Sequence, residues 1–410
     1  MATLGIDFGT SNSAAGYLRE GKPHLVSMAP GETTLPTAVF FDFDARKMVV
    51  GHPANAALLS GAEGRFMRAL KRVLGTSLMH EKRQLLNERI TFVDIIGRFL
   101  AHLKVRAETE AERTFDRALS GRPVVFHGAG DPREAQAEAD LRACYHAAGF
   151  ADVTFLPEPE AAAIAAGSPD HIGTLGLIVD IGGGTSDFSI FRTARDGIDI
   201  LANHGVRIGG TDFDRSVSIA QVMPLLGLGS LLRNAIGPGT LPAPRAIFHD
   251  LATWEKIPFL YTAKTLRDVQ AMVRQAEAPE RMGRLATVLE NELGHDVAFA
   301  VEAGKIAANG AATADIDLSQ IEPGLHAPLT SATLQEVLAP FAAQLVQGVT
   351  GALAHADCDA ANIGQVIYVG GSSLMDLVTR TMRTRFPAAH HSFGEVFTGV
   401  ADGLAISAGD

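Results

Sequence analysis

Cysteine, positive charge and long apolar runs are scarce in this sequence, and each scarcity excludes a class of protein. The two cysteines, Cys144 and Cys358, lie far apart in the chain, so neither a disulfide framework nor a Cys-x-x-Cys zinc site is expected. No run approaches the roughly 18 consecutive apolar residues of a membrane-spanning helix. The N-terminus also lacks the basic segment and apolar stretch of a secretory signal. The sequence therefore predicts a soluble, cytoplasmic protein with no membrane partner.

The deficit of positive charge bears on the possible partners. The chain has 35 Lys and Arg residues against 46 Asp and Glu residues, which gives a net charge of −11. Sequence-independent binding of nucleic acid needs a basic surface, so no nucleic-acid partner is expected. Hydrophobic residues make up 47% of the 410 residues, a balance typical of a globular protein. A single hydrophobic core stops growing near about 250–300 residues, so two lobes are expected.

Several common nucleotide-binding and catalytic motifs are missing as well. There is no Gly-x-x-x-x-Gly-Lys-Ser/Thr segment, no Gly-x-Gly-x-x-Gly turn between a strand and a helix, and no Gly-x-Ser-x-Gly turn. The 14 histidines include no His-Glu-x-x-His pair. These absences argue against P-loop NTPases, Rossmann-type dinucleotide sites, α/β-hydrolases and zinc enzymes of that type.

Alternating strand-like and helix-like segments predict an α/β fold, in which sheets are covered by helices. The segments expected to form strands are 4–8, 13–18, 37–43, 124–126, 153–156, 175–191 (a strand–turn–strand unit) and 365–369. The segments expected to be mainly helical are 54–119, 133–148, 161–166, 246–310 and 399–406.

Two of these segments share one design. Residues 6–12 (Ile-Asp-Phe-Gly-Thr-Ser-Asn) and 179–187 (Val-Asp-Ile-Gly-Gly-Gly-Thr-Ser-Asp) each carry an apolar strand to an aspartate. Each then turns through glycine, presents a hydroxyl side chain and returns as a strand. Because the two units lie about one lobe apart, they predict duplicated lobes that face each other across a cleft.

Such turns suit phosphate and magnesium. Glycines after a strand let successive backbone N–H groups converge on an anion, because no Cβ blocks the approach. The hydroxyl groups of Thr10, Ser11 and Thr185 add donors. The carboxylates of Asp7 and Asp180 would repel phosphate, so they are expected to orient waters around a Mg²⁺ ion that bridges the phosphates. A third glycine turn, at 369–373, also follows an apolar strand. Together these turns predict a site for Mg-ATP.

In these motifs the sequence resembles the nucleotide-binding domain of the DnaK-type seventy-kilodalton heat-shock chaperones, and in its length it resembles the shorter YegD-like branch. The resemblance runs over nearly the whole chain. Its ordered segments are 5–13, 69–75, 121–124 with Pro123, 158–163, 180–187, 209–214, 301–309 and 370–372. It implies an actin-like (ribonuclease H-like) ATPase fold with two lobes around a nucleotide cleft, and ATP or ADP with Mg²⁺ as ligands.

The resemblance implies a role for each matching residue. Lys71 would stabilise charge on the transferring phosphoryl group, while Glu158 and Asp187 would orient or deprotonate the attacking water beside Thr185. Asp7 and Asp180 would hold the metal through water, and Glu302 and Lys305 would bind the ribose. The residues that would contact the nucleotide are Gly9, Thr10, Ser11, Asn12, Gly182, Gly183, Gly184, Thr185, Gly209, Gly210, Glu302, Lys305, Ile306, Asn309, Gly370, Gly371, Ser372 and Leu374.

The sequence also departs from the family. The family sandwiches adenine between two arginines, whereas the matching positions here are Ile306 and Leu374. An apolar sandwich loses cation–π attraction of about 0.5–2 kcal/mol per contact, so weaker or less base-selective binding is expected. An acid near the C-terminus of the family's domain has no counterpart at 397–400, so turnover is expected to be slow or absent. Simpler interpretations also remain: Lys71 could belong to a solvated basic face, and Glu302 with Lys305 could form an i,i+3 helix pair.

The predicted organisation is lobe I at 1–170, with a helical insert at about 45–118, and lobe II at 171–410, with a helical insert at about 214–325. No domain for gripping peptides is expected. The predicted function is that of a chaperone-like ATPase that binds ATP, hydrolyses it slowly and signals to a protein partner or client by lobe closure. The alternatives are a non-hydrolysing nucleotide sensor, an actin-like filament protein and a small-molecule kinase of the same fold.

Overall fold

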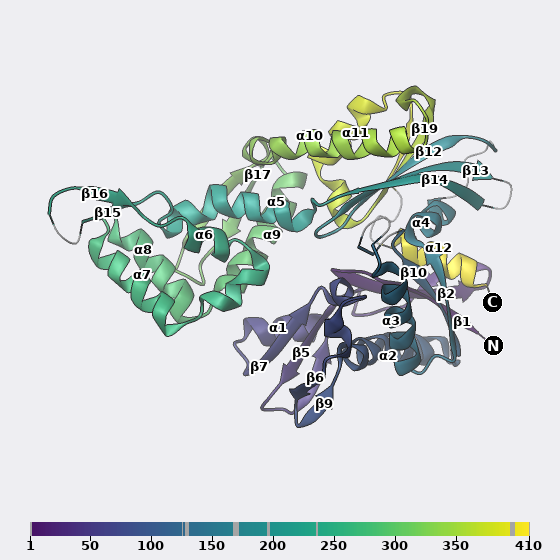
Figure 1. Cartoon of the computed structure of the whole chain (residues 1–410), viewed down its shortest axis with the longest axis horizontal. Coiled ribbons are helices and arrows are strands. Elements are labelled where there is room, and N and C mark those ends of the chain that lie inside the picture. Colours follow the sequence, from purple (N-terminus) through teal and green to yellow (C-terminus); the bar gives the residue numbers. More distant parts are fainter. Residues whose placement is uncertain are drawn as a thin grey trace. The chain divides into compact units, whose positions relative to one another are not determined.

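The computed structural model describes residues 2–124, 126–127, 131–166, 172–194, 197–234, 237–393 and 398–409. The chain forms two compact units (Figure 1). The first comprises Met1–Arg207, Leu345–Leu374 and Thr381–Asp410, and the second comprises Ile208–Gln344 and Met375–Arg380. The predicted lobe boundary at residues 170 and 171 lies outside the described residues, at 167–171, and it stays a prediction.

The first unit holds two mixed sheets, of which the N-terminal one has the strand order β11-β10-β1-β2-β3, with β4 paired to β2. Its strands are β1 (Thr3–Phe8), β2 (Asn12–Arg19), β3 (Lys22–Leu25), β4 (Thr34–Pro36), β10 (Arg117–Arg122) and β11 (Asp152–Pro157). Strands β1, β2 and β3 are antiparallel neighbours, whereas β10 runs parallel to β1 and β11 runs parallel to β10.

The second sheet repeats this plan with the order β14-β13-β12-β19-β20. Its strands are β12 (Leu175–Ile181), β13 (Ser186–Ala194), β14 (Gly197–Val206), β19 (Ile363–Val369) and β20 (His390–Ser392). Again three strands form an antiparallel series and two further strands continue in parallel. The repeated strand–turn–strand unit predicted from the sequence is therefore confirmed.

Three helices follow the strands of each sheet in the same order. They are α2 (Phe92–Ala111), α3 (Glu134–Ala147) and α4 (Glu158–Ala166) in the first half, and α10 (Ser331–His355), α11 (Asp376–Arg385) and α12 (Gly399–Ala408) in the second. The last helix of each half reaches the other sheet. Helix α4 follows β11 and contacts β14 and β19 as well as β10 and β11 of its own sheet, and α12 follows β20 but packs on β1, β2 and β3. The two helices also pack on each other (Figure 1).

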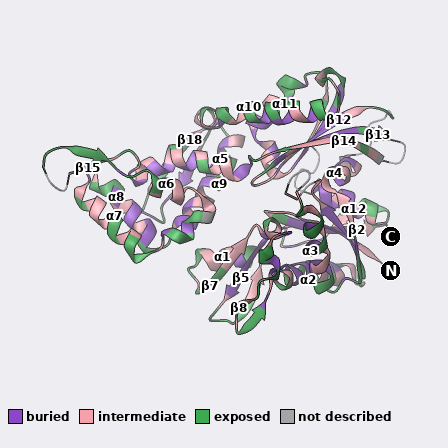
Figure 2. Cartoon of the chain, viewed as in Figure 1, coloured by how far each residue is buried: buried purple, intermediate pink, exposed green. Residues whose placement is uncertain are grey.

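Apolar side chains and one glycine explain this packing. The central strands read as nearly continuous apolar runs because both of their faces are covered; Ile6 of β1 and Val179 of β12, for example, are fully buried, and Figure 2 shows buried residues along both sheets. Between α4 and α12, a Cβ on Gly403 would lie only 1.8 Å from the carbonyl oxygen of Ala161. The two helix backbones can approach this closely only because residue 403 is glycine.

The rest of the first unit is less helical than the sequence predicted. Between β4 and α2 lie β5 (Ala38–Asp42), β6 (Lys47–Val50), α1 (His52–Leu59), β7 (Gly64–Arg68), β8 (Arg83–Leu85) and β9 (Glu88–Ile90), with 3₁₀ turns at Leu70–Val73 and Ser77–His80. The prediction that 54–119 is mainly helical is thus wrong for 64–90. These strands are short and carry many charged residues, so their alternating pattern is weak.

The strand predicted at 124–126 is also wrong. The strand is β10, which ends at Arg122, while Val124 and Phe126 lie in bends and residue 125 lies outside the described residues. Pro123 follows β10 directly, and proline cannot donate to a strand ladder. The true strand contains Ser120 and Gly121 at its buried centre, so it lacks the apolar run that marks a buried strand.

The second unit is mainly helical, which confirms the helical prediction for 246–310. Its helices are α5 (Gly210–Val217), α6 (Ala246–Leu251), α7 (Ala263–Gln275), α8 (Pro279–Glu290) and α9 (Gly294–Gly310). Two hairpins accompany them, β15 (Leu231–Arg233) with β16 (Thr240–Pro242) and β17 (Thr313–Asp317) with β18 (His326–Thr330).

Helix α10 is the one helix among the described residues that is long and apolar enough, by length and composition alone, to cross a membrane. A single such helix is weak evidence, because core helices of other proteins meet the same criteria. Leu345 and Val349 of α10 are fully buried, and Gly348 lies against the ring of Phe188 on the second sheet. The contacts of α10 are thus those of a helix that covers a sheet.

Candidate functional site

The two predicted phosphate turns join equivalent strands of the two sheets. One connects β1 to β2 through residues 9–11, and the other connects β12 to β13 through residues 182–185. Asp7 pairs with Ala14 across the first hairpin, and Asp180 pairs with Asp187 across the second. Each aspartate therefore stands one residue before the end of its strand, at the same place in the repeated plan.

The backbone of these turns is so compact that glycine is needed. A Cβ on Gly9 would lie 2.1 Å from the carbonyl oxygen of Asn12. The N–H of Gly182 donates to the carbonyl oxygen of Thr185 at 3.0 Å and closes the second turn. At the third predicted turn Gly370 has a φ of +77°, which favours glycine. A Cβ there would lie 2.9 Å from Oδ1 of Asp180, so the third turn lies against the end of β12.

Lys71 lies among the carboxylates of both hairpins. Its Nζ is 2.5 Å from Oε1 of Glu158, and the two side chains are only 10% and 14% exposed. Asp7 and Asp180 are close enough to act electrostatically on the ammonium group, and Glu158 acts in the same way on Asp187. The structure thus brings together the three charged residues predicted to be catalytic and the two predicted to hold the metal.

Burial and mutual repulsion raise the pKa values of these carboxyl groups. Burial first, and repulsion from Glu158 second, raise the pKa of Asp7 to about 7 and that of Asp187 to about 6. The same two causes raise the pKa of Asp180 well above its ordinary value. Burial acts to lower the pKa of Lys71, but attraction to Glu158 and Asp7 raises it on balance. Four carboxyl groups around one ammonium group leave an excess of negative charge.

The excess of negative charge at these residues fits a divalent cation. Among the described residues, no group of three or more His, Cys, Asp or Glu side chains is placed to hold a metal ion. Mg²⁺ usually keeps several waters and takes only one or two carboxylates together with phosphate oxygens. Asp7 and Asp180, at matching strand ends, fit that donor set.

Arg72 is a second cation at the site that was not predicted from the sequence. A Cβ on Gly184 would lie 1.7 Å from Nη2 of Arg72, so the guanidinium group lies directly against the second turn. The signal in the sequence was its place next to Lys71. Spacing alone could not tell a guanidinium that reaches a glycine turn from one in a basic surface.

The predicted adenosine segment forms part of α9 in the second unit. Glu302, Ile306 and Asn309 follow each other at intervals of three or four residues and so share one side of the helix. Glu302 is half-buried, and Ile306 is 61% exposed. Asn309 accepts a hydrogen bond at its Oδ1 from the N–H of Asp376 at 2.8 Å, so it supports the start of α11. Of the three, Ile306 presents the largest free apolar surface.

Lys305 and the glycine turn at 209–210 meet at α5. Lys305 is buried, and its Nζ lies 2.7 Å from Oδ1 of Asp214. The N–H of Gly209 donates to Oδ2 of Asp212 at 3.0 Å, which caps α5 at its first residue, Gly210. The partner that the structure gives Lys305 is thus Asp214, rather than the helix neighbour considered in the sequence analysis.

The remaining predicted residues belong to the first unit. Gly371, Ser372 and Leu374 form a 3₁₀ turn after β19, closed by a hydrogen bond of 2.7 Å from the hydroxyl of Ser373 to the carbonyl oxygen of Gly370. The predicted nucleotide residues are therefore divided along the chain. The phosphate turns and residues 370–374 lie in the first unit, and residues 209–210 and α9 lie in the second.

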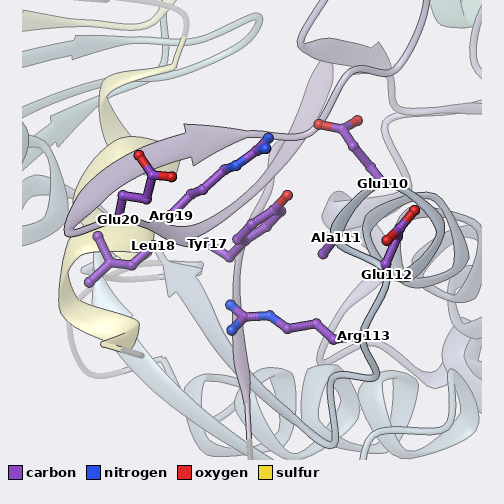
Figure 3. Close-up of a pocket in the computed structure, with 8 residues that line it drawn as sticks. All are labelled: Tyr17, Leu18, Arg19, Glu20, Glu110, Ala111, Glu112 and Arg113. Atoms are coloured by element: carbon purple, nitrogen blue, oxygen red, sulfur yellow. The ribbon is translucent and has the colours of Figure 1, made fainter.

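A pocket of about 490 Å³ between the end of β2 and the end of α2 contains none of these residues (Figure 3). Two of its charged side chains, those of Arg113 and Glu110, contact other parts of the fold. The guanidinium group of Arg113 lies over the ring of Tyr17 at 5.2 Å and over that of Phe115 at 5.0 Å. The carboxylate of Glu110 accepts a hydrogen bond of 2.9 Å from the N–H of Ser27. These contacts join the C-terminal end of α2 and the residues after it to β2 and to the segment after β3.

Comparison with known proteins gives two family matches in different parts of the chain. The Hsp70 protein family matches residues 3–93, and the MreB/Mbl protein family matches residues 130–222. The chain is also similar to "Chaperone protein dnaK1" of Prochlorococcus marinus, with 25% identity over 434 aligned positions that cover 99% of this chain. These matches support an Hsp70-family nucleotide-binding domain.

The Hsp70 match includes the first turn and Lys71, and the MreB/Mbl match includes Glu158 and the second turn. Both are families of actin-like ATPases, so the predicted α/β, actin-like fold is confirmed, and the two repeated sheets agree with it. The chain spans only 56% of the length of the relative from Prochlorococcus. The family matches support nucleotide binding and a relationship to chaperones. The assignment to a YegD-like branch stays a prediction.

Proposed function

We propose that this Hsp70-type domain binds Mg-ATP at its two glycine turns, hydrolyses it slowly and passes the resulting conformational change to a protein partner or client in the cytoplasm. The observation that carries this proposal is the buried Lys71–Glu158 pair among the carboxyl groups of Asp7, Asp180 and Asp187. Burying so many charges together costs free energy that packing alone does not repay. A metal-bound triphosphate would make use of each of them.

The turns and the two cations would hold the phosphates. Backbone N–H groups of residues 9–11, and of residues 184 and 185 in the second turn, would donate to phosphate oxygens, and the hydroxyl groups of Thr10 and Thr185 would add further donors. Lys71 would face the terminal phosphate and stabilise the charge that develops there. Arg72, whose guanidinium lies against Gly184, would hold the phosphate at the second turn.

The acids divide into two proposed roles. Mg²⁺ would supply positive charge that neutralises the phosphate oxygens, and Asp7 and Asp180 would hold it through water. Glu158 and Asp187 would position the attacking water and accept its proton. The pKa of Asp187, raised to about 6 by burial and by Glu158, brings this carboxylate closer to the value that suits a proton acceptor near neutral pH.

Two other functions have specific support. A non-hydrolysing nucleotide sensor is favoured by Ile306, an exposed apolar residue where the family carries an arginine. An actin-like filament protein is favoured by the MreB/Mbl match to residues 130–222. Assembly that depends on ATP and is seen by sedimentation would support the filament function.

The testing experiment is single-turnover ATP hydrolysis with Mg²⁺, together with ATP affinity measured on the same samples. We expect slow hydrolysis by the unmodified protein and a loss of about 100-fold or more in Lys71→Ala, with affinity nearly unchanged, because the lysine acts mainly on the transition state. Lys264→Ala is the matched control, since this lysine on α7 is 81% exposed. Binding without hydrolysis in the unmodified protein would favour the sensor and remove the catalytic roles.

A further inference from the structure

The segment that carries Lys71 and Arg72 is short and irregular. It is a 3₁₀ turn, Leu70–Val73, preceded by Ala69 with a φ of +56° and followed closely by Gly75 with a φ of +77°. A single 3₁₀ turn has poor hydrogen-bond geometry and little rigidity of its own. Two cations that must meet a phosphate group to within a fraction of an ångström therefore need support from outside the turn.

That support is a clamp on the Leu74–Gly75 peptide, which is held at both of its polar atoms. The N–H of Gly75 donates to Oδ2 of Asp140 at 2.9 Å. The carbonyl oxygen of Leu74 accepts from Nε2 of His127 at 2.7 Å. Because both hydrogen bonds act on one rigid peptide plane, they fix its orientation as well as its position.

Both arms of the clamp are anchored to α3. Asp140 is a residue of α3 that is only 1% exposed, and its Oδ1 accepts from Gln136 at 2.7 Å and from His80 at 3.0 Å. Glu134, at the start of α3, accepts the backbone N–H of His127 at 2.6 Å. These hydrogen bonds fix the turn that carries the two cations relative to α3.

The glycine at residue 75 belongs to the same arrangement. A Cβ there would lie 2.8 Å from the carbonyl oxygen of Arg133 and 2.9 Å from Nε2 of His127. Its positive φ also favours glycine over any other residue. The turn is thus pressed against the start of α3, where only glycine allows both contacts.

We propose that Asp140 and His127 are positioning residues that hold Lys71 and Arg72 in place through the Leu74–Gly75 peptide. The use of those cations to bind phosphate rests on the proposed function. The clamp itself rests on the hydrogen bonds to the Leu74–Gly75 peptide. Asp140 contributes as a hydrogen-bond acceptor on a buried peptide. An asparagine keeps an oxygen that can accept from the Gly75 N–H, although its amide group cannot accept from Gln136 and His80. It should therefore replace Asp140 in large part, whereas an alanine should not.

The test compares Asp140→Ala and Asp140→Asn with Cys144→Ala, a control that removes a fully buried side chain one turn further along α3 and leaves the clamp intact. Two quantities are measured. One is the chemical shift of the Lys71 ammonium group in ¹⁵N-lysine-labelled protein without nucleotide, assigned from its absence in Lys71→Ala. The other is the single-turnover hydrolysis rate together with ATP affinity.

We expect Asp140→Ala to move the Lys71 signal towards those of exposed lysines and to slow hydrolysis by about tenfold or more, with ATP affinity within about threefold. Asp140→Asn, which keeps the acceptor for the Gly75 N–H, should restore most of both quantities, and Cys144→Ala should change neither. If Asp140→Ala behaves like Cys144→Ala, the clamp has no positioning role. A signal that moves in a protein that never hydrolyses ATP would uphold the clamp and refute the ATPase function. If hydrolysis depends on Lys71 but the Lys71 signal does not move in Asp140→Ala, the ATPase function is upheld and the clamp is refuted.

Discussion

At the scale of single residues, the site is defined by charges that the fold keeps out of water. Lys71 and Glu158 are each less than one-fifth exposed, and burial is the largest cause of the raised pKa values of Asp7, Asp180 and Asp187. Protonation, a metal ion or a phosphate-bound cation can each relieve the repulsion among these carboxyl groups. The state of the site should therefore be visible in the stability of the protein.

The first residue-scale prediction concerns pH. In the folded protein, burial and repulsion from Glu158 raise the pKa of Asp7 to about 7 and that of Asp187 to about 6, from an ordinary pKa of 3.8. Because the folded state binds these protons more tightly than the unfolded chain, their contribution to stability is complete below about pH 4. It is lost as the pH rises through about 6 to 7. The melting temperature of the metal-free protein should accordingly fall between pH 5 and pH 8.

Asp7→Asn should flatten that fall, because an amide does not titrate. Asp268→Asn is the control, since Asp268 is 60% exposed on α7, and it should leave the slope as it is. Added Mg²⁺ should raise the melting temperature of the unmodified protein more at pH 8 than at pH 5.5, because ionised carboxylates bind it. The same slope in Asp7→Asn and in the unmodified protein would show that Asp7 is not the group responsible.

At the scale of elements, α4 and α12 pack on each other, and this packing depends on a close approach of the two helix backbones. Gly403→Ala would place a Cβ 1.8 Å from the carbonyl oxygen of Ala161, so the helices must separate. Overpacking of this kind costs about 1–3 kcal/mol, and denaturant unfolding should show it as a lower midpoint with an unchanged slope.

Gly399→Ala is the matched control for that prediction. A Cβ at this first residue of α12 meets nothing within 4 Å, and alanine has the higher helix propensity. Its stability should equal or exceed that of the unmodified protein. Equal losses in both variants would mean that α12 is sensitive to any substitution and that the contact with α4 is not special.

The elements also show what the sequence can and cannot predict. Both phosphate hairpins were predictable, because an apolar strand, an aspartate and a glycine turn are local signals, and their pairing follows. Strands β7, β8 and β9 were not, since each has at most five residues, several of them charged. The contacts of α4 and α12 with the sheet of the other half were not predictable either. An apolar helix face shows that a helix is covered, but it does not show by which sheet.

At the scale of the whole molecule, the sequence predicted the repeated strand–turn–strand units, and the structure adds how the chain is grouped into compact units. Residues 172–194 and 197–207 belong to the same compact unit as the N-terminal sheet, and the second unit is built around 208–344. This grouping depends on contacts between distant segments, which local patterns do not encode. Arg72 was missed for a related reason, because its contact with Gly184 joins two parts of the chain that lie far apart in sequence.

The last prediction uses this division of the predicted nucleotide residues between the units. A phosphate-only ligand such as tripolyphosphate probes the glycine turns alone, whereas ATP also probes the predicted adenine position at Ile306. This side chain is 61% exposed, so Ile306→Arg should fold normally and restore a cation–π contact of about 0.5–2 kcal/mol.

Calorimetric titration should then show ATP binding that is about 2- to 30-fold tighter in Ile306→Arg, with tripolyphosphate binding unchanged. Ala307→Arg is the control, because residue 307 is also exposed on α9 but points about 100° away around the helix. It adds the same charge without the stacking position. Equal tightening of both ligands, or equal effects of the two arginines, would assign the gain to general electrostatic attraction. The base would then be bound elsewhere, and the role predicted for Ile306 from the family resemblance would be wrong.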